Sequence, residues 1–350
     1  MADVAVAILG LARTGVSMGL ALKRQNQKGG AHTFKVTGYD SATPRMKTAQ
    51  KMGAVGETVA QSENAVKGKD IVVIVTPYGE TKNTYDYIAS SLRAGAVVLD
   101  ATPLNQKALE WGKQYLPSSA HQVCIRPIVN PKYLFEGVDE PERATDDFFD
   151  NGSMMLMPSV TCAKEAVELA ADFARILGAR PHYLDPAEHD GLAAGMEGLP
   201  SLIGAAYFYM MSQNPGWMDA QRLTNPSFGM LAHVLMDTHP DDLRDVWINS
   251  STDLLRYTDD MIATLRNFRG LIASKDQAAL EAAVEESSKE FETWVNRRHN
   301  NRWQDDEKLE SKAPGFGDVV GGMFGNFIGG RRKKDDEKYS SDCRNHWITK

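Results

Sequence analysis

The chain contains few cysteines and no long apolar segment. Cys124, Cys162 and Cys343 are far apart and form no Cys-x-x-Cys pair, which argues against a disulfide framework or a structural zinc site. No stretch approaches the roughly 18 apolar residues that span a bilayer. The N-terminus has no basic segment before its apolar run, so no signal peptide is expected. These absences predict a protein of the reducing cytoplasm.

Excess positive charge is also missing. The 350 residues carry a formal net charge of −7, which argues against a general nucleic-acid-binding protein. P-loop, G-x-S-x-G and H-E-x-x-H motifs are absent, and no spacing of histidines and carboxylates suggests a metal. With 42% hydrophobic residues, a chain of this length is expected to form two domains.

Short apolar runs alternate with helical segments in the first half of the chain. The predicted strands cover residues 4–9, 34–39, 71–75, 96–99, 123–125, 154–157 and 182–184. The predicted helices between them include residues 14–23, 43–51, 81–92 and 161–177. Strands that alternate with helices predict right-handed crossovers and a mostly parallel sheet.

The pattern changes after Asp185, where strand runs disappear and helical segments continue to about residue 303. Residues 199–211 are apolar on nearly every side, which indicates a helix buried in a bundle or in a dimer interface. We predict a first domain of residues 1–184, a helical domain of residues 185–310 and a glycine-rich, then charged tail of residues 311–350. The tail is expected to be flexible, with contact to a membrane or partner as the alternative.

A glycine-containing turn follows the first predicted strand, with the sequence Gly10-Leu11-Ala12-Arg13-Thr14-Gly15. It matches G-x-G-x-x-G except that Ala12 replaces the middle glycine. Gly10 permits the sharp turn, the small Ala12 lets the backbone approach a pyrophosphate, and Gly15 lets the helix pack close to the sheet. The N-terminus of the following helix offers free N–H groups and a positive dipole to phosphates.

An acidic residue ends the second predicted strand, as dinucleotide binding requires. Asp40 lies 25 residues after Gly15, and its carboxylate can accept hydrogen bonds from ribose hydroxyls and repel a 2′-phosphate. NAD is therefore the expected cofactor, while Arg13 and Arg45 keep NADP possible. The fold class is α/β: a Rossmann-type, doubly wound, mostly parallel sheet followed by an all-helical dimerisation domain.

The order of the motifs resembles the prephenate/arogenate dehydrogenase family. ILGLARTGVSMGLALK followed by VTGYD is similar to the start of that family, and GAVGETVAQSENAVKGKDIVVIVTP resembles its approach to Pro77. DPAEHDGLAAGMEGLPSLIGAA is similar to the family's entry into its helical domain, and HPDDLRDVWINS to a later helix. The resemblance covers roughly residues 4–295.

This resemblance implies a homodimer formed through the helical domains and an active site in the cleft between domains. It implies oxidative decarboxylation of a small cyclic carboxylate, with hydride transfer to the nicotinamide, and a role in tyrosine biosynthesis. Further cofactor contacts are expected from Thr76, Pro77 and Thr102, which follow two of the predicted strands.

The chain departs from the family on the substrate side of that cleft. Arg126 stands where the family has a histidine that contacts the reacting hydroxyl, and a guanidinium cannot act as a base at neutral pH. Pro103 and Asn105 occupy the serine and lysine places of a Gly-Ser-x-Lys segment. Glu197-Gly198-Leu199-Pro200-Ser201 replaces Ser-His-Leu-Pro-His.

Four residues are candidates for the chemistry. His189, Glu197 and His233 can supply a general base, because an imidazole titrates near neutrality and burial raises a glutamate toward it. His233 aligns near a substrate-binding arginine of the family. Arg126 is better suited to clamp a substrate carboxylate. Each residue also has a purely structural explanation. His189 can be a residue of the domain junction, Glu197 and Arg126 can form ion pairs, and His233 can be an ordinary helix residue.

Three functional hypotheses follow. The first is an NAD-dependent dehydrogenase of the prephenate/arogenate type with altered substrate-site residues and a small carboxylate substrate. The second is a catalytically inactive dinucleotide-binding or structural homologue. The third is a reductase of the hydroxyacid or imine type with the same two-domain layout.

Overall fold

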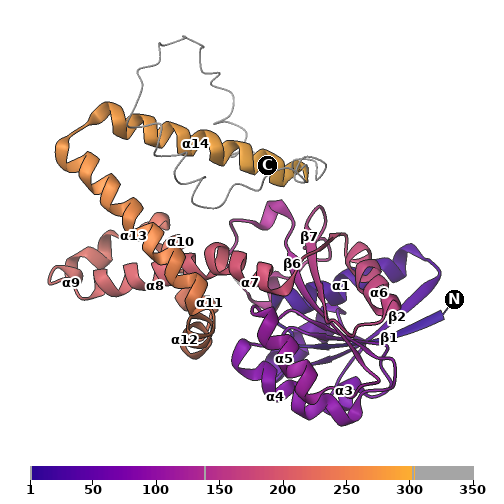
Figure 1. The fold of residues 1–350 in the computed structure, drawn as a ribbon. Helices are drawn as coiled ribbons and strands as arrows, with labels where there is room; N and C mark the ends of the chain where they lie inside the picture. The colour runs from indigo at the N-terminus through magenta and orange to yellow at the C-terminus, as the bar shows by residue number, and fades with distance from the viewer. Residues whose placement is uncertain (1, 138, 302, 304–350) are drawn as a thin grey trace.

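A computed structural model describes residues 2–137, 139–301 and 303 (Figure 1). Within these residues, eight strands form a single sheet in the order β3-β2-β1-β4-β5-β6-β7-β8. The strands are β1 (Ala2–Leu9), β2 (His32–Tyr39), β3 (Glu57–Thr58), β4 (Ile71–Ile74), β5 (Val97–Asp100), β6 (His121–Ile128), β7 (Ser153–Pro158) and β8 (Arg180–Tyr183). The predicted tail of residues 311–350 lies outside the described residues.

The sheet is mostly parallel, as the sequence predicted. β6 and β7 form its antiparallel pair, with Cys124 opposite Met157, and β8 pairs in parallel with β7. All seven predicted strands are present with small shifts at their ends. β3 was not predicted, because its two residues carry no periodic pattern.

Helices cover both faces of the sheet, so its central strands are buried on both sides. In β1, Val6 and Ile8 belong to one hydrophobic cluster, while Ala7 and Leu9 belong to the cluster on the opposite face. This explains why β1 reads as a continuous apolar run instead of an alternating one. The covering helices are α1 (Arg13–Lys28), α2 (Thr43–Met52), α3 (Ser62–Val66), α4 (Tyr78–Ile88), α5 (Asn105–Tyr115) and α6 (Lys164–Ile176).

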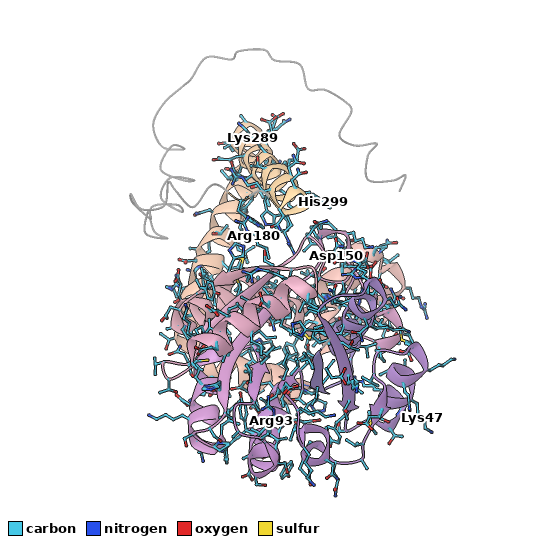
Figure 2. The ribbon with its side chains drawn as sticks, turned by 90° about the vertical axis from the view of Figure 1, so that its right-hand side faces the viewer. Lys47, Arg93, Asp150, Arg180, Lys289 and His299 are labelled. Atoms are coloured by element: carbon cyan, nitrogen blue, oxygen red, sulfur yellow. The ribbon has the colours of Figure 1, made fainter. Side chains whose placement is uncertain are left out.

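Among the described residues, those after β8 form helices only, and these helices lie beside the sheet (Figure 1). α13 leads away from the sheet, and α14 returns toward it. Figure 2 shows α14, marked by Lys289 and His299, above the sheet domain. The elements are α7 (Pro186–Ala193), the π-helical turn η4 (Ala194–Gly198), α8 (Leu199–Ser212), α9 (Trp217–Ala220), α10 (Pro226–Ala232), α11 (Val234–Asp237), α12 (Pro240–Asn249), α13 (Ser251–Ser274) and α14 (Gln277–Asn300).

The apolar helix α8 was predicted to be buried in a bundle or in a dimer interface. Within this chain α8 is only partly covered, because Gly204 is its buried residue while Tyr209 and Met210 are 68% and 58% exposed. The alternative, burial between two copies, remains a prediction. Among the described residues, no helix is long and apolar enough to cross a membrane.

The packing of α1 on the sheet yields a stability prediction. A Cβ at Gly15 would lie 2.0 Å from the carbonyl oxygen of Gly10, whereas one at the helical Gly270 would meet nothing within 4 Å. We expect Gly15→Ala to lower the free energy of unfolding by about 2 kcal/mol or more, because backbone must move to admit the methyl group. Gly270→Ala should raise it by up to about 1 kcal/mol. Urea unfolding followed by circular dichroism measures both; equal effects would contradict this packing.

Candidate functional site

The turn between β1 and α1 presents backbone N–H groups at the carboxyl end of the parallel strands. Gly10 has φ +101°, and a Cβ there would lie 2.3 Å from the carbonyl oxygen of Val75. α1 begins at Arg13 after the extended Ala12, so the first N–H groups of the helix have no intrahelical partner. Only glycine fits the first position, and the local geometry favours a bound phosphate.

Asp40 joins the end of β2 to this turn. Its Oδ2 accepts the Leu11 N–H at 2.7 Å and its Oδ1 accepts the Ala42 N–H at 2.8 Å. The residue is only 5% exposed, yet it lines the cavity beside the turn. Its carboxylate is therefore fixed in place where a ribose would lie against the turn.

A cavity of about 500 Å³ opens at the turn and is shared by the two domains. The sheet domain lines it with Gly10, Ala12, Asp40, Arg45, Val75, Thr76, Pro77, Tyr78, Ala101, Pro103, Arg126 and Asp139. The helical domain lines it with Glu197, Gly198, Ser201, Val234, Asp237, Thr238, His239, Asp242, Leu243, Val246 and Trp247. Its volume and its position at the carboxyl ends of the strands fit a small ligand together with part of a cofactor.

The predicted cofactor residues gather at this end of the sheet. Gly10, Ala12, Asp40, Thr76 and Pro77 line the cavity. The other predicted positions are not among the residues that line it: Leu11 in the turn, Arg13, Thr14 and Gly15 in the first turn of α1, and Thr102 after β5. These sequence predictions are therefore spatially coherent.

Thr102 takes part in a buried hydrogen-bond network below the cavity. Its hydroxyl donates to Asp100 at 2.6 Å, and Asp100 also accepts the Tyr85 hydroxyl at 2.6 Å. Burial raises the pKa of Asp100, although these hydrogen bonds oppose the shift. Thr102 therefore fixes the end of β5 and lies beneath the cavity surface.

The two arginines that kept NADP possible have different positions. Arg13 is 3% exposed, its guanidinium lies 4.5 Å from the centre of the Phe148 ring, and it forms an ion pair with Glu136 at 2.6 Å. Arg45 lines the cavity and lies 4.0 Å from Asp40. Arg45 is thus the arginine placed to meet a phosphate on the ribose.

Arg126 and Glu197 meet across the boundary between the domains. Arg126 projects from β6 and Glu197 from η4; Arg126 Nε donates to Glu197 Oε1 at 2.9 Å, and Nη2 donates to Oε2. Their side chains are 26% and 41% exposed, and both line the cavity. The bidentate pair means that a ligand carboxylate at Arg126 competes with Glu197.

His189 was predicted as a general base, but it is buried among hydrogen-bond partners of the chain. It is 5% exposed, and its Nδ1 lies 2.6 Å from Asn105 Nδ2 and 3.2 Å from Asp190 Oδ1. Asp190 in turn accepts the N–H groups of Asn105 and Gln106, the first residues of α5. His189 thus fastens α7 to α5 and is not among the residues that line the cavity.

His233 also lies outside the cavity lining. Its Nδ1 is 2.9 Å from the Met230 carbonyl oxygen, and its Nε2 is 3.5 Å from Asp237. The ring packs against Gly137, where a Cβ would fall 2.4 Å from His233 Cδ2. Its neighbours are therefore the β6–β7 connection and its own helix.

Sequence reasoning missed several cavity residues. Trp247 Nε1 donates to Ser201 Oγ at 2.9 Å, and burial raises the pKa of Tyr78 to about 12. Asp242 accepts the N–H of Gly79 at 2.7 Å, at the start of α4. His239 supplies the imidazole among the described lining residues. Tyr78 and Trp247 sit in helical patterns that look like ordinary core positions, so nothing in the sequence marked them.

Comparisons with known proteins agree with this layout. Residues 18–183 match the family model "Prephenate dehydrogenase, nucleotide-binding domain". The chain is 22% identical over 275 residues to the prephenate dehydrogenase of Bacillus subtilis strain 168, covering 77% of this chain and 71% of that protein. The match to the family model begins after the turn of residues 10–15, so the assignment of the turn rests on its geometry.

Solved structures of similar shape have two named activities. Prephenate dehydrogenase of Aquifex aeolicus, solved with hydroxyphenyl propionate and NAD+, superposes with a TM-score of 0.69 at 19% identity and covers 84% of this chain and 98% of that one. Arogenate dehydrogenase of Synechocystis superposes with a TM-score of 0.61 at 18% identity, covering 83% and 99%. These likenesses establish the fold.

The strand order, the glycine turn and the shared cavity define a two-domain protein with a Rossmann-type nucleotide-binding domain. Within that class, residues 18–183 match the nucleotide-binding domain of prephenate dehydrogenase, and the chain as a whole is similar to a curated prephenate dehydrogenase.

The Arg126–Glu197 pair yields a prediction about the domain boundary. In a double-mutant cycle with Arg126→Gln and Glu197→Gln, we expect a coupling free energy of about 1 kcal/mol, since the pair is bidentate but partly exposed. The exposed pair of Asp172 and Arg175 on α6 is the control and should couple by less than about 0.5 kcal/mol. Urea unfolding of the variants measures both; coupling no larger than the control would contradict a specific contact.

Proposed function

We propose that this chain is an NAD-dependent dehydrogenase of the prephenate/arogenate type, with a substrate site unlike that of its relatives. The observation that carries the proposal is the cavity in which the glycine turn and Asp40 face residues of the helical domain. Bound NAD would accept a hydride from a substrate held at the opposite wall. The chain supplies the α1 N-terminus for the phosphates and Asp40 for the ribose.

The geometry around Asp40 supports NAD over NADP. The carboxylate is buried and already fixed by two backbone N–H groups, so it accepts ribose hydroxyls without reordering. A 2′-phosphate would approach this charge at short range. Arg45 at 4.0 Å offsets part of the repulsion, which leaves NADP as the weaker ligand.

The substrate side supports a small carboxylate held near Arg126 and Trp247. Glu197 must release Arg126, at least in part, before a carboxylate can bind there. Glu197, once released, is placed at the cavity wall to accept a proton, and His239 is the nearby imidazole. The positions of His189 and His233 outside the lining do not support either as the base.

A homodimer is part of the proposal. Large apolar side chains on the helical domain are exposed in the single chain, and contact with a second copy would remove them from water. They include Tyr209, Met210, Met230, Ile248, Leu255, Leu265 and Ile272.

A second candidate is a homologue that binds the dinucleotide without catalysis. The Arg126–Glu197 ion pair favours it, because the two groups best placed for substrate chemistry satisfy one another. Absorbance at the reduced-nicotinamide band, with NAD and either prephenate or arogenate, separates the candidates. Reduction of NAD supports the dehydrogenase, whereas binding of NAD without reduction of NAD by either substrate supports the silent homologue.

The cofactor preference provides a separate test. We expect Asp40→Ser to weaken NAD about tenfold and to reduce the preference over NADP, because it removes the ribose acceptor and the repelling charge together. Glu80→Gln is the matched control: it removes a nearby charge, hydrogen-bonded to Ser41 at 3.5 Å, but no ribose contact. Isothermal titration with both cofactors measures the preference. An unchanged NAD/NADP ratio in Asp40→Ser would contradict this role.

A further inference from the structure

An acidic segment of the β6–β7 connection covers the N-terminus of α1. Glu136, Gly137 and Asp139 lie between this helix and the helical domain, and we call these three residues the acidic loop. Glu136 Oε2 pairs with Arg13 Nη2 at 2.6 Å. The carbonyl oxygen of Asp139 accepts the Arg13 N–H at 3.4 Å. The loop therefore contacts both the side chain and the backbone of the first helical residue.

The side chain of Asp139 occupies the same position. Its carboxylate lies near the backbone N–H groups of Arg13 and Thr14, which favour the ionised form of this carboxylate. These are the donors that a pyrophosphate would use at this helix. Asp139 lines the cavity together with Gly10 and Ala12, so its charge lies at the cofactor end of that cavity.

The helical domain holds the acidic loop from the other side. The carboxylate of Asp237, at the end of α11, lies near the backbone N–H of Asp139, which favours the ionised form of that carboxylate. Gly137 packs against the His233 ring so closely that a Cβ would lie 2.4 Å from His233 Cδ2. These contacts give His233 and Asp237 a structural role in connecting the domains.

We propose that the acidic loop is an internal competitor for the dinucleotide phosphates, and that cofactor binding displaces Asp139 from the α1 N-terminus. A carboxylate and a phosphate cannot accept the same N–H groups, and their like charges repel. The apparent affinity for the cofactor then equals the intrinsic affinity multiplied by the fraction of molecules in which the loop is displaced. The undisplaced loop therefore lowers the affinity. Displacement also breaks the Asp139–Asp237 contact, which couples cofactor binding to the helical domain. This inference rests on the dinucleotide binding proposed above.

Charged groups from several elements face Asp139. Arg45 of α2 favours its ionised form, as do the N–H groups of α1, while Asp237 of α11 opposes it. Glu136 and Glu140 lie on the same connection, and His233 lies next to Asp237. Burial against these elements raises the pKa of Asp139 to about 6. Its charge is therefore lost as the pH falls through about 6, and we expect the affinity for NAD to rise over that range.

Isothermal titration of the full chain with NAD tests the competition. Asp139→Asn should bind NAD about tenfold more tightly than the unmodified chain near pH 7.5, a gain of about 1.4 kcal/mol. Its affinity should also change less between about pH 7.5 and 5.5, because the titrating group is gone. Glu142→Gln is the matched control: Glu142 lies on the same connection and bonds Thr48 at 3.1 Å. It should stay within about twofold of the unmodified chain.

A second variant tests the hold from the helical domain. Asp237→Ala removes the carboxylate that lies beside the Asp139 N–H, so we expect NAD to bind about threefold more tightly. Equal affinities for the unmodified chain, Asp139→Asn and Asp237→Ala would overturn the competition and leave dinucleotide binding intact. Failure of every variant, Asp139→Asn included, to bind NAD would overturn the proposed function and this inference with it.

Discussion

The close contact between α1 and the end of β1 is the constraint on which the rest of the structure depends. Gly15 lies so near the Gly10 carbonyl that no side chain fits, and Gly10 approaches Val75 in the same way. This packing aims the start of α1 at the carboxyl edge of the sheet. Asp40 then completes the site, because its hydrogen bond to Leu11 ties the end of β2 to the turn. The cavity lies where the turn after β1 meets the end of β2.

Charges around the cavity are already compensated by other groups of the chain. The backbone carbonyl of Asp139 accepts the Arg13 N–H at the start of α1, Asp242 accepts the Gly79 N–H at the start of α4, and Glu197 neutralises Arg126. A ligand therefore exchanges partners instead of entering an uncompensated site, and its net binding energy is the difference between two sets of contacts. Asp139 belongs to the sheet domain, whereas Asp242 and Glu197 belong to the helical domain. A ligand that replaces their contacts therefore changes the contacts between the domains.

The sequence predicts those parts of the fold that local pattern controls. Buried apolar runs located β1, β4 and β5, and the G-x-A-x-x-G spacing located the turn, because tight backbone packing leaves few residue choices. Arg126 and Glu197 were predicted separately, each with an ion pair to an unnamed partner as its structural alternative. The sequence did not predict the long-range contacts. His189 bonds Asn105 across 84 positions, and Asp139 contacts α1 from a connection that has no periodic pattern. Contacts of that kind depend on where whole elements come to lie.

The central claim is that the start of α1 receives the phosphates of NAD in place of an acid of the chain. A crystal structure of the complex with NAD tests it most directly. The account predicts the pyrophosphate on the N–H groups of Arg13 and Thr14, the ribose on Asp40, and Asp139 moved away from α1. A structure with NAD bound and Asp139 still on those N–H groups, or with the phosphates bound elsewhere, would contradict it.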